Sequence, residues 1–449
     1  QSSQPDDYRP VTVLPILSKV YERLIAKQII QHVNKNNVYK STMSGFRRNH
    51  STTTLMLKIR DDIIKAMEKG EVTLALFSDY SKAFDTVEYS QTLRKLHHIG
   101  FSKTAITWML SYLTDRYQFV QINDKRSSKG RVRFGVPQGS VLGPVIFNLY
   151  VTDLQDCVQG TIYQFADDTS SLEHCKVKNL PACEARVNQQ LSEMQNWSTI
   201  NNLSYNQGKT KCMLLSTTKM SQVHNLDEYK ININCSGESI EQVKAIKLLG
   251  VILDHHLTFE KHVNELISSC YRKIFVLKKL KNFAPWHVRK QLAESLVLSK
   301  LDYCNVLLFN ITQLRLRRLQ QVQKAAAGFV NGKFCKIPDI IELGWLPIID
   351  KINYNILKLT HQVLYNNEFP DYLTVQREQN RHSKRKQQEN DCDIRLTTPN
   401  TTKTFSGAAS RLFNELPSNI RGEENYDLFC TSLKSFYLDQ ALAKYLNTH

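Results

Sequence analysis

The chain has little of what would place it in a membrane, outside the cell or around a structural metal. Its longest purely apolar stretches are a few residues, such as Val306 to Phe309, so no segment is long enough to span a bilayer. No charged-then-apolar leader opens the sequence, and secretion is therefore not expected. The ten cysteines include no CxxC pair, which indicates reduced thiols rather than a zinc site or a disulfide framework.

What the chain does have is length, apolar content and positive charge. Its 449 residues are 41% hydrophobic, which is enough for two or three domains with buried cores. Lys and Arg number 59 against 42 Asp and Glu, a net charge of +17. Such a surplus repels itself unless it faces an anion, so nucleic acid is the first partner to consider. Because residue 1 is Gln rather than Met, we expect a piece of a longer chain.

Apolar residues at helical spacing alternate with short apolar runs that predict strands. We expect helices at 17–30 and 51–69, before Gly100, after Ser102, up to Asp153 and around 187–197. Strands are expected at 73–78, 118–122, 131–134, 161–166 and 169–174, and around residues 213, 231 and 248–253. This irregular mixture favours an α+β sheet layered with helices over a doubly wound fold.

Beyond about residue 258 the pattern is helical and strongly basic. From Glu260 to Lys324 there are 13 basic and 4 acidic residues, an excess larger than half the net charge of the chain. Arg377 to Asn390 is polar and basic, as expected of a linker. The remainder, to His449, reads as a small separate unit with a C-terminal helix.

Acidic pairs alone carry no signal, because the sequence contains three: Asp6-Asp7, Asp61-Asp62 and Asp167-Asp168. Only the third lies between two apolar strands, at the turn of an expected hairpin. It is either a solvated turn or a site for hard divalent cations, which prefer carboxylate oxygens. A two-metal site needs a further carboxylate from another strand, and Asp79 follows the strand 73–78 directly.

Alternatives remain for each neighbour of this acidic set. Asp79 could simply end its strand, and Asp85 could be a metal ligand or serve local hydrogen bonding. Gly135 to Pro144 is not a Walker loop, since no Gly-Lys-Ser/Thr follows. Its glycines allow close approach of a ligand ahead of a helix N-terminus, although a plain loop-to-helix junction would look similar.

In this order, the segments resemble the polymerase motifs of reverse transcriptases, and more narrowly the jockey-like group of non-LTR (LINE-type) retrotransposons. The matching segments are Tyr8 to Val11, Lys19 to Leu24, Gly45 to Arg47 with His50 to Thr52, Phe77 to Asp85, Gly135 to Pro144, Phe165 to Asp168, Asn206 with Lys209-Thr210, Leu248 to Val251, Leu301 to Asn305, Leu319-Gln320 with Ala325 to Ala327, Trp345 to Ile348, and Phe413-Asn414 with Leu416-Pro417.

The resemblance implies a right-hand polymerase fold with fingers, a ferredoxin-like palm and a helical thumb. The implied domains are partial fingers at 1–72, palm at 73–256 (1–256 being the reverse transcriptase domain), a basic thumb at 257–370, a basic linker or loop at 371–395 and a C-terminal unit at 396–449. Arg315, Arg317, Arg318 and Lys324 would then contact phosphates of a primer–template, although charge runs are more often a solvated helical surface.

The family also implies roles for the acidic residues. Asp79, Asp167 and Asp168 would be the catalytic carboxylates and would hold two Mg²⁺ ions, with Mn²⁺ as an alternative. Lys209 would be a general acid for departure of pyrophosphate.

Four further residues are expected to meet the incoming nucleotide. Gln138 and Gly139 would contact it, and Arg47 would contact its triphosphate. Phe84 matches the bulky residue that rejects a ribose 2′-hydroxyl, where the alternative is an ordinary core aromatic.

The implied function is RNA-directed DNA polymerisation, in which a DNA primer is extended on an RNA template with deoxynucleoside triphosphates. The family usually carries an upstream endonuclease, which we do not expect in this piece, and acts in the nucleus after a cytoplasmic ribonucleoprotein stage. One rival is an RNA-dependent RNA polymerase, which Phe84 argues against. The other is a catalytically inactive, nucleic-acid-binding remnant. Template preference and oligomeric state stay open.

Overall fold

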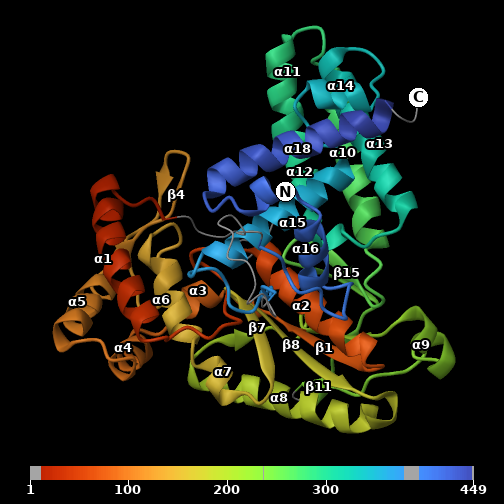
Figure 1. The fold of residues 1–449 in the computed structure, drawn as a ribbon. Helices are drawn as coiled ribbons and strands as arrows, with labels where there is room; N and C mark the ends of the chain where they lie inside the picture. The colour runs from red at the N-terminus through yellow and green to blue at the C-terminus, as the bar shows by residue number, and fades with distance from the viewer. Residues whose placement is uncertain (1–11, 236, 379–393, 447–449) are drawn as a thin grey trace, which may run out of the picture. The chain divides into compact units, whose positions relative to one another are not determined.

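The computed structural model describes residues 12–235, 237–378 and 394–446, which form two compact units (Figure 1). Unit 1 falls within Gln1–His50, Thr73–Leu214 and Asn225–Val243, and unit 2 within Ser51–Val72, Leu215–His224 and Lys244–His449. The expected entry motif at 8–11 and most of the basic tract at 377–390 lie outside the described residues.

Unit 1 is built on a five-stranded sheet with the order β13-β10-β1-β8-β7. Every residue of β1 is buried, as expected of an apolar central strand. β7 and β8 form an antiparallel hairpin, and the long helix α8 packs against β8 (Figure 1). The strands are β1 (Val72–Ser78), β7 (Thr161–Phe165), β8 (Asp168–Cys175), β10 (Lys211–Leu215) and β13 (Glu241–Gln242).

Helices and short strand pairs surround this sheet. α4 packs on α5 and α6, and α1 on α6. The helices are α1 (Ile16–Lys35), α3 (Ala83–Thr86), α4 (Tyr89–His98), α5 (Lys103–Leu113), α6 (Leu142–Val151), α7 (Leu154–Cys157), the 3₁₀ turn η2 (Val177–Asn179) and α8 (Leu180–Ile200). The short strands are β2 (Tyr80–Ser81), β3 (Tyr117–Gln118), β4 (Gln121–Ile122), β5 (Lys125–Arg126), β6 (Gly130–Arg131), β9 (Ser204–Tyr205), β11 (Asn234–Cys235) and β12 (Glu238–Ser239).

Unit 2 is largely helical in its described residues. α10 packs on α13, and α15 packs on α16 and α18. Its elements are α2 (Thr52–Glu68), α9 (Thr218–His224), β14 (Ala245–Leu248), β15 (Val251–Asp254), α10 (Glu260–Lys278), α11 (Trp286–Ala293), the π turn η3 (Glu294–Leu298), α12 (Ser299–Asp302), the 3₁₀ turn η4 (Asn305–Leu308), α13 (Gln313–Asn331), α14 (Ile337–Glu342), α15 (Ile348–Tyr365), α16 (Phe405–Asn414), α17 (Ser418–Arg421) and α18 (Tyr426–Leu446). None of the described helices is long and apolar enough to cross a membrane.

Some strand expectations were wrong in detail. The segment 248–253 is not one strand but contains the end of β14, a turn and most of β15, because Leu249 and Gly250 both adopt positive φ and form a two-residue turn. The segment 118–122 is divided between β3 and β4, and of 131–134 only Arg131 lies in a strand, β6. β3 pairs with β6, and β4 pairs with β5. Residue 231 lies outside any strand.

Candidate active site

A cavity of about 800 Å³ in unit 1 brings most of the predicted site residues together. Asp168 begins β8 one residue after a lining residue and is half-buried, while Arg47 is not part of the lining. The predicted residues that line the cavity are Asp79, Phe84, Gln138, Gly139, Asp167 and Lys209.

Asp79 stands where the buried strand β1 ends, and its side chain is 24% exposed. Lys209 forms an ion pair with it, the Nζ lying 3.4 Å from Asp79 Oδ2. Asn206 donates from its side chain to the same oxygen at 3.5 Å, and from its backbone N–H to the Asp79 carbonyl at 2.9 Å. The loop between β9 and β10 is thereby fastened to the end of β1, with a cation facing the carboxylate.

Asp167 lies in the turn of the β7–β8 hairpin, which another segment supports. Ala166 adopts a φ of +58°, and the last strand pair is Phe165 with Asp168. Gly45 lies so close that a Cβ there would be 2.3 Å from the Ala166 nitrogen. The Asn148 amide donates to the Gly45 carbonyl at 2.6 Å. Only glycine fits at position 45, which explains why this motif accompanies the acidic turn.

The glycine-punctuated loop is held against Asp85. Gly135 has a φ of +83°, and a Cβ on it would lie 2.8 Å from Asp85 backbone atoms. Its N–H donates to the Val87 carbonyl at 2.8 Å. The Gln138 side chain donates to Asp85 Oδ1 at 2.8 Å. Of the two roles left open for Asp85, the structure thus contains the local hydrogen bond, which orients Gln138.

Phe84 forms a rigid aromatic wall of the cavity. It is half-buried and stacks on Phe147 with ring centres 4.2 Å apart, while Phe46 meets its ring edge-on at 6.0 Å. Such contacts fix the ring in place. Phe84 therefore packs on a core aromatic and also lines the cavity, and its role in rejecting a 2′-hydroxyl stays a prediction.

Glu22 is a supporting residue whose role could not be read from the sequence. It is almost fully buried, and its Oε2 accepts the backbone N–H groups of Val141 (2.7 Å) and Leu142 (3.2 Å) at the start of α6. A carboxylate is favourable at a helix N-terminus. Burial, helped by the nearby Glu22 charge, raises the pKa of Tyr112 to about 12. The only sequence signal was its place in the Lys19 to Leu24 motif.

Arg47 is engaged with its own neighbourhood. Its Nη1 donates to the carbonyls of Lys40 (2.9 Å) and Met43 (2.7 Å), and its guanidinium lies 5.3 Å from the centre of the Tyr39 ring. Its predicted contact with a triphosphate stays a prediction.

The donor set fits a divalent metal ion. Asp79, at the end of β1, and Asp167, in the turn after β7, line one cavity, and hard cations prefer carboxylate oxygens. Asp168 is adjacent. Gln138 and Gly139 of the glycine-punctuated loop line the same cavity.

An α+β fold that places carboxylates at the ends of two strands, beside a glycine-punctuated loop, is typical of polymerase-type nucleotidyltransferases. The family described as reverse transcriptase (RNA-dependent DNA polymerase) matches residues 2–253, more than half of the chain. The chain belongs to this family. The match confirms the expected resemblance to reverse transcriptases and the expected α+β, right-hand polymerase fold.

Several relatives come from mobile elements of Drosophila. The probable RNA-directed DNA polymerase from transposon BS of Drosophila melanogaster is 30% identical over 62% of this chain and 31% of its own length. The RNA-directed DNA polymerases from mobile element jockey of Drosophila melanogaster and Drosophila funebris are 28% and 31% identical, each over 60% of this chain and 29% of their own length. The chain thus spans less than a third of these relatives.

Among solved structures, apo telomerase from Candida tropicalis is similar at 12% identity, over 75% of this chain and 54% of its own, with a TM-score of 0.42.

Proposed function

We propose that this chain is the RNA-directed DNA polymerase of a non-LTR retrotransposon and extends a DNA primer on an RNA template. One observation carries the proposal: Asp79, Asp167, Phe84 and Gln138 line a single cavity in a member of the reverse transcriptase family. The matching relatives are named as polymerases of mobile elements, which supports the same activity here.

In this mechanism Asp79, Asp167 and Asp168 would hold two Mg²⁺ ions, with Mn²⁺ as an alternative. When bound, these ions supply positive charge that favours ionisation of the primer 3′-hydroxyl and offsets charge on the phosphates. Lys209 donates a proton to the departing pyrophosphate.

The remaining residues select and orient the nucleotide. Gln138, held by Asp85, and Gly139 contact the incoming deoxynucleoside triphosphate. The Phe84 ring, fixed by Phe147, excludes a ribose 2′-hydroxyl, and this favours DNA synthesis over RNA synthesis.

The same proposal assigns the earlier domain limits: partial fingers at 1–72, palm at 73–256, thumb at 257–370, linker at 371–395 and a C-terminal unit at 396–449. It also implies that the protein acts in the nucleus after a stage in a cytoplasmic ribonucleoprotein.

The test is primer extension on an RNA template with deoxynucleotides and Mg²⁺, comparing the parent chain with Asp79→Asn and Asp167→Asn. These variants remove charge and keep shape, so extension should fall at least about a hundredfold while the duplex is still bound. Asp439→Asn is the matched control, because Asp439 is exposed on α18, and it should extend normally.

A catalytically inactive remnant is the second candidate. Salt-sensitive duplex binding without extension by the parent would favour it and overturn the polymerase proposal. Equal extension by the parent and Asp167→Asn would instead refute the assigned site.

A further inference from the structure

The segment from Asp115 to Phe134 forms a two-stranded ribbon that covers no core. β3 pairs with β6 and β4 with β5, and every residue from 117 to 131 is exposed. An isolated two-stranded ribbon is only marginally stable in water, because it has no buried face. Folding therefore does not explain why this ribbon (residues 115–134) carries large apolar side chains.

The side chains that it presents are aromatic and basic. Tyr117 is 64% and Phe119 43% exposed. Tyr117 lies opposite Arg131 across the ribbon, and the Arg126 guanidinium lies 5.3 Å from the centre of the Phe119 ring. The ribbon carries two acidic residues, Asp115 and Asp124, against six basic ones, Arg116, Lys125, Arg126, Lys129, Arg131 and Arg133.

Stacking rings interleaved with cations are what proteins use to bind single-stranded nucleic acid without sequence preference. Bases stack on the rings, while phosphates meet the positive charges. The positive charge that attracts phosphates is concentrated on the ribbon itself, because its excess of four positive charges lies within twenty residues.

The ribbon also leads directly to the cavity. Its last residue precedes Gly135, whose N–H is bonded to the Val87 carbonyl and which opens the loop bearing Gln138 and Gly139. In Figure 1 the ribbon, labelled β4, projects beyond α6. A nucleic-acid strand bound to the ribbon is therefore bound by the segment that continues into the lining of the cavity.

We propose that the ribbon binds the single-stranded nucleic acid that flanks the primer–template duplex, by stacking bases on Tyr117 and Phe119. This surface goes beyond the polymerase site and needs no catalysis. The strand is template RNA ahead of the duplex, because the ribbon leads into the loop whose Gln138 and Gly139 line the cavity. Unpaired DNA is the alternative outcome of the test.

Binding of labelled nucleic acid, measured by fluorescence anisotropy with the full chain, tests this proposal. One probe is a blunt RNA–DNA duplex, and two others carry an added overhang of about ten nucleotides of RNA or of DNA, a length in the range of single-stranded site sizes. The variant Tyr117→Ala with Phe119→Ala removes both rings and keeps the charge. Val120→Ala with Ile122→Ala is the matched control, because those side chains are 60% and 70% exposed on the same ribbon.

The parent chain should bind an overhang-bearing probe about 5- to 100-fold more tightly than the blunt one. The double aromatic variant should lose this increment with unchanged blunt affinity, and the control should keep it. The RNA overhang should give the larger increment, and a larger increment with the DNA overhang would overturn the assignment to template RNA. An increment that survives in the aromatic variant, or that is absent from the parent, would overturn the proposal. Because no nucleotide is added, either result is independent of whether the chain extends a primer.

Discussion

The acidic residues of the site could be predicted from the sequence, but the groups that support them could not. Asp79 and Asp167 each adjoin an apolar strand, and strands of one sheet end at fixed positions relative to one another. Glu22 binds backbone groups about 120 positions away, so no local pattern reveals it. The bonds of Arg47 could not be predicted either, because they depend on the geometry of the turn at 40–43.

Gly135 offers a test at this scale. In Gly135→Ala the new Cβ would meet the Asp85 backbone at 2.8 Å, and the φ of +83° disfavours any L side chain. We expect primer extension to fall at least tenfold and the melting temperature to drop, since about 1–2 kcal/mol of strain accompanies the clash. Gly130→Ala is the control, because nothing lies within 4 Å of its added Cβ. Full activity of Gly135→Ala would show that the loop relaxes freely.

At the scale of elements, the periodicity of apolar residues predicted where helices form but not what the polar side chains of those helices contact. The expected helix at 51–69 is α2, which begins at Thr52 and is capped by the Ser51 side chain. The basic residues of α13, by contrast, could not be sorted from the sequence into those that bind a ligand and those that hold another helix. Their spacing is the same in both cases.

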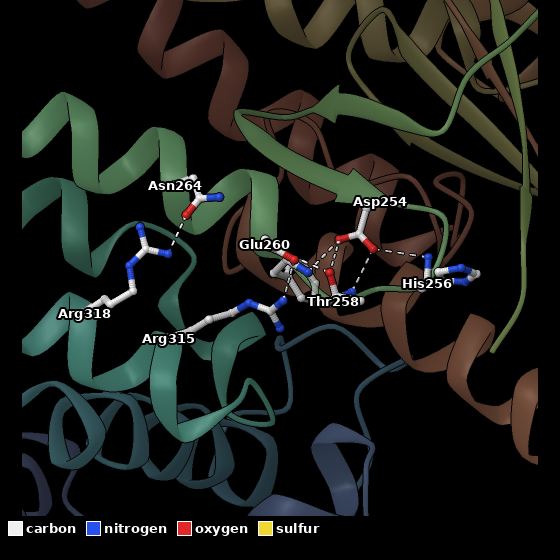
Figure 2. Close-up of polar contacts among 8 residues, drawn as sticks. Asp254, His256, Thr258, Glu260, Asn264, Arg315 and Arg318 are labelled. Carbon is white, nitrogen blue, oxygen red and sulfur yellow. Dashed lines mark hydrogen bonds and ion pairs between the residues drawn. The ribbon is translucent and has the colours of Figure 1, made fainter. Parts of the chain in front are cut away.

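Figure 2 shows how α13 and its neighbour α10 are held. Asp254 accepts the backbone N–H groups of Thr258 (2.9 Å) and Phe259 (2.6 Å) just before α10. Arg315 donates to Glu260 at 2.8 Å, and Arg318 donates to Asn264 at 2.7 Å. Both arginines therefore connect the two helices.

Arg317 differs from them, because it is exposed and has no polar partner among the described residues. We expect Arg317→Ala to weaken duplex binding severalfold and to lower the salt slope of the affinity by about 1, as loss of one phosphate contact does. Arg315→Ala should instead destabilise the α10–α13 pair by up to about 1 kcal/mol. Anisotropy titrations at several salt concentrations and thermal melts check both. Equal salt slopes for Arg317→Ala and the parent would show that Arg317 does not contact a phosphate of the nucleic acid.

At the scale of the whole molecule, two buried acids give the stability a dependence on pH. Burial raises the pKa of Asp61 to about 6, against the lowering effect of Arg60. Burial likewise raises the pKa of Asp350 to about 6, against the effect of Lys444. Asp61 also accepts the backbone N–H of Phe405 at 2.7 Å, so replacing it would leave Arg60 and that group without a partner. Asp350 is therefore the better residue for testing how stability depends on pH.

A carboxyl group whose pKa is higher in the folded state binds more protons there than in the unfolded chain. The free energy of unfolding that it contributes is therefore complete below about pH 4 and is lost as the pH rises through 6. Asp350→Asn removes the ionisation, so at pH 7.5 this variant should be more stable than the parent by about 1–3 kcal/mol, and at pH 4 the gain should largely disappear. Thermal melts across this range measure the difference.

Asp439→Asn makes the same charge change on the exposed side of α18 and should show no such trend. This control separates the burial of Asp350 from the general effect of losing a negative charge on a basic protein. A gain for Asp350→Asn that stays constant from pH 4 to 7.5 would mean that Asp350 does not titrate in this window.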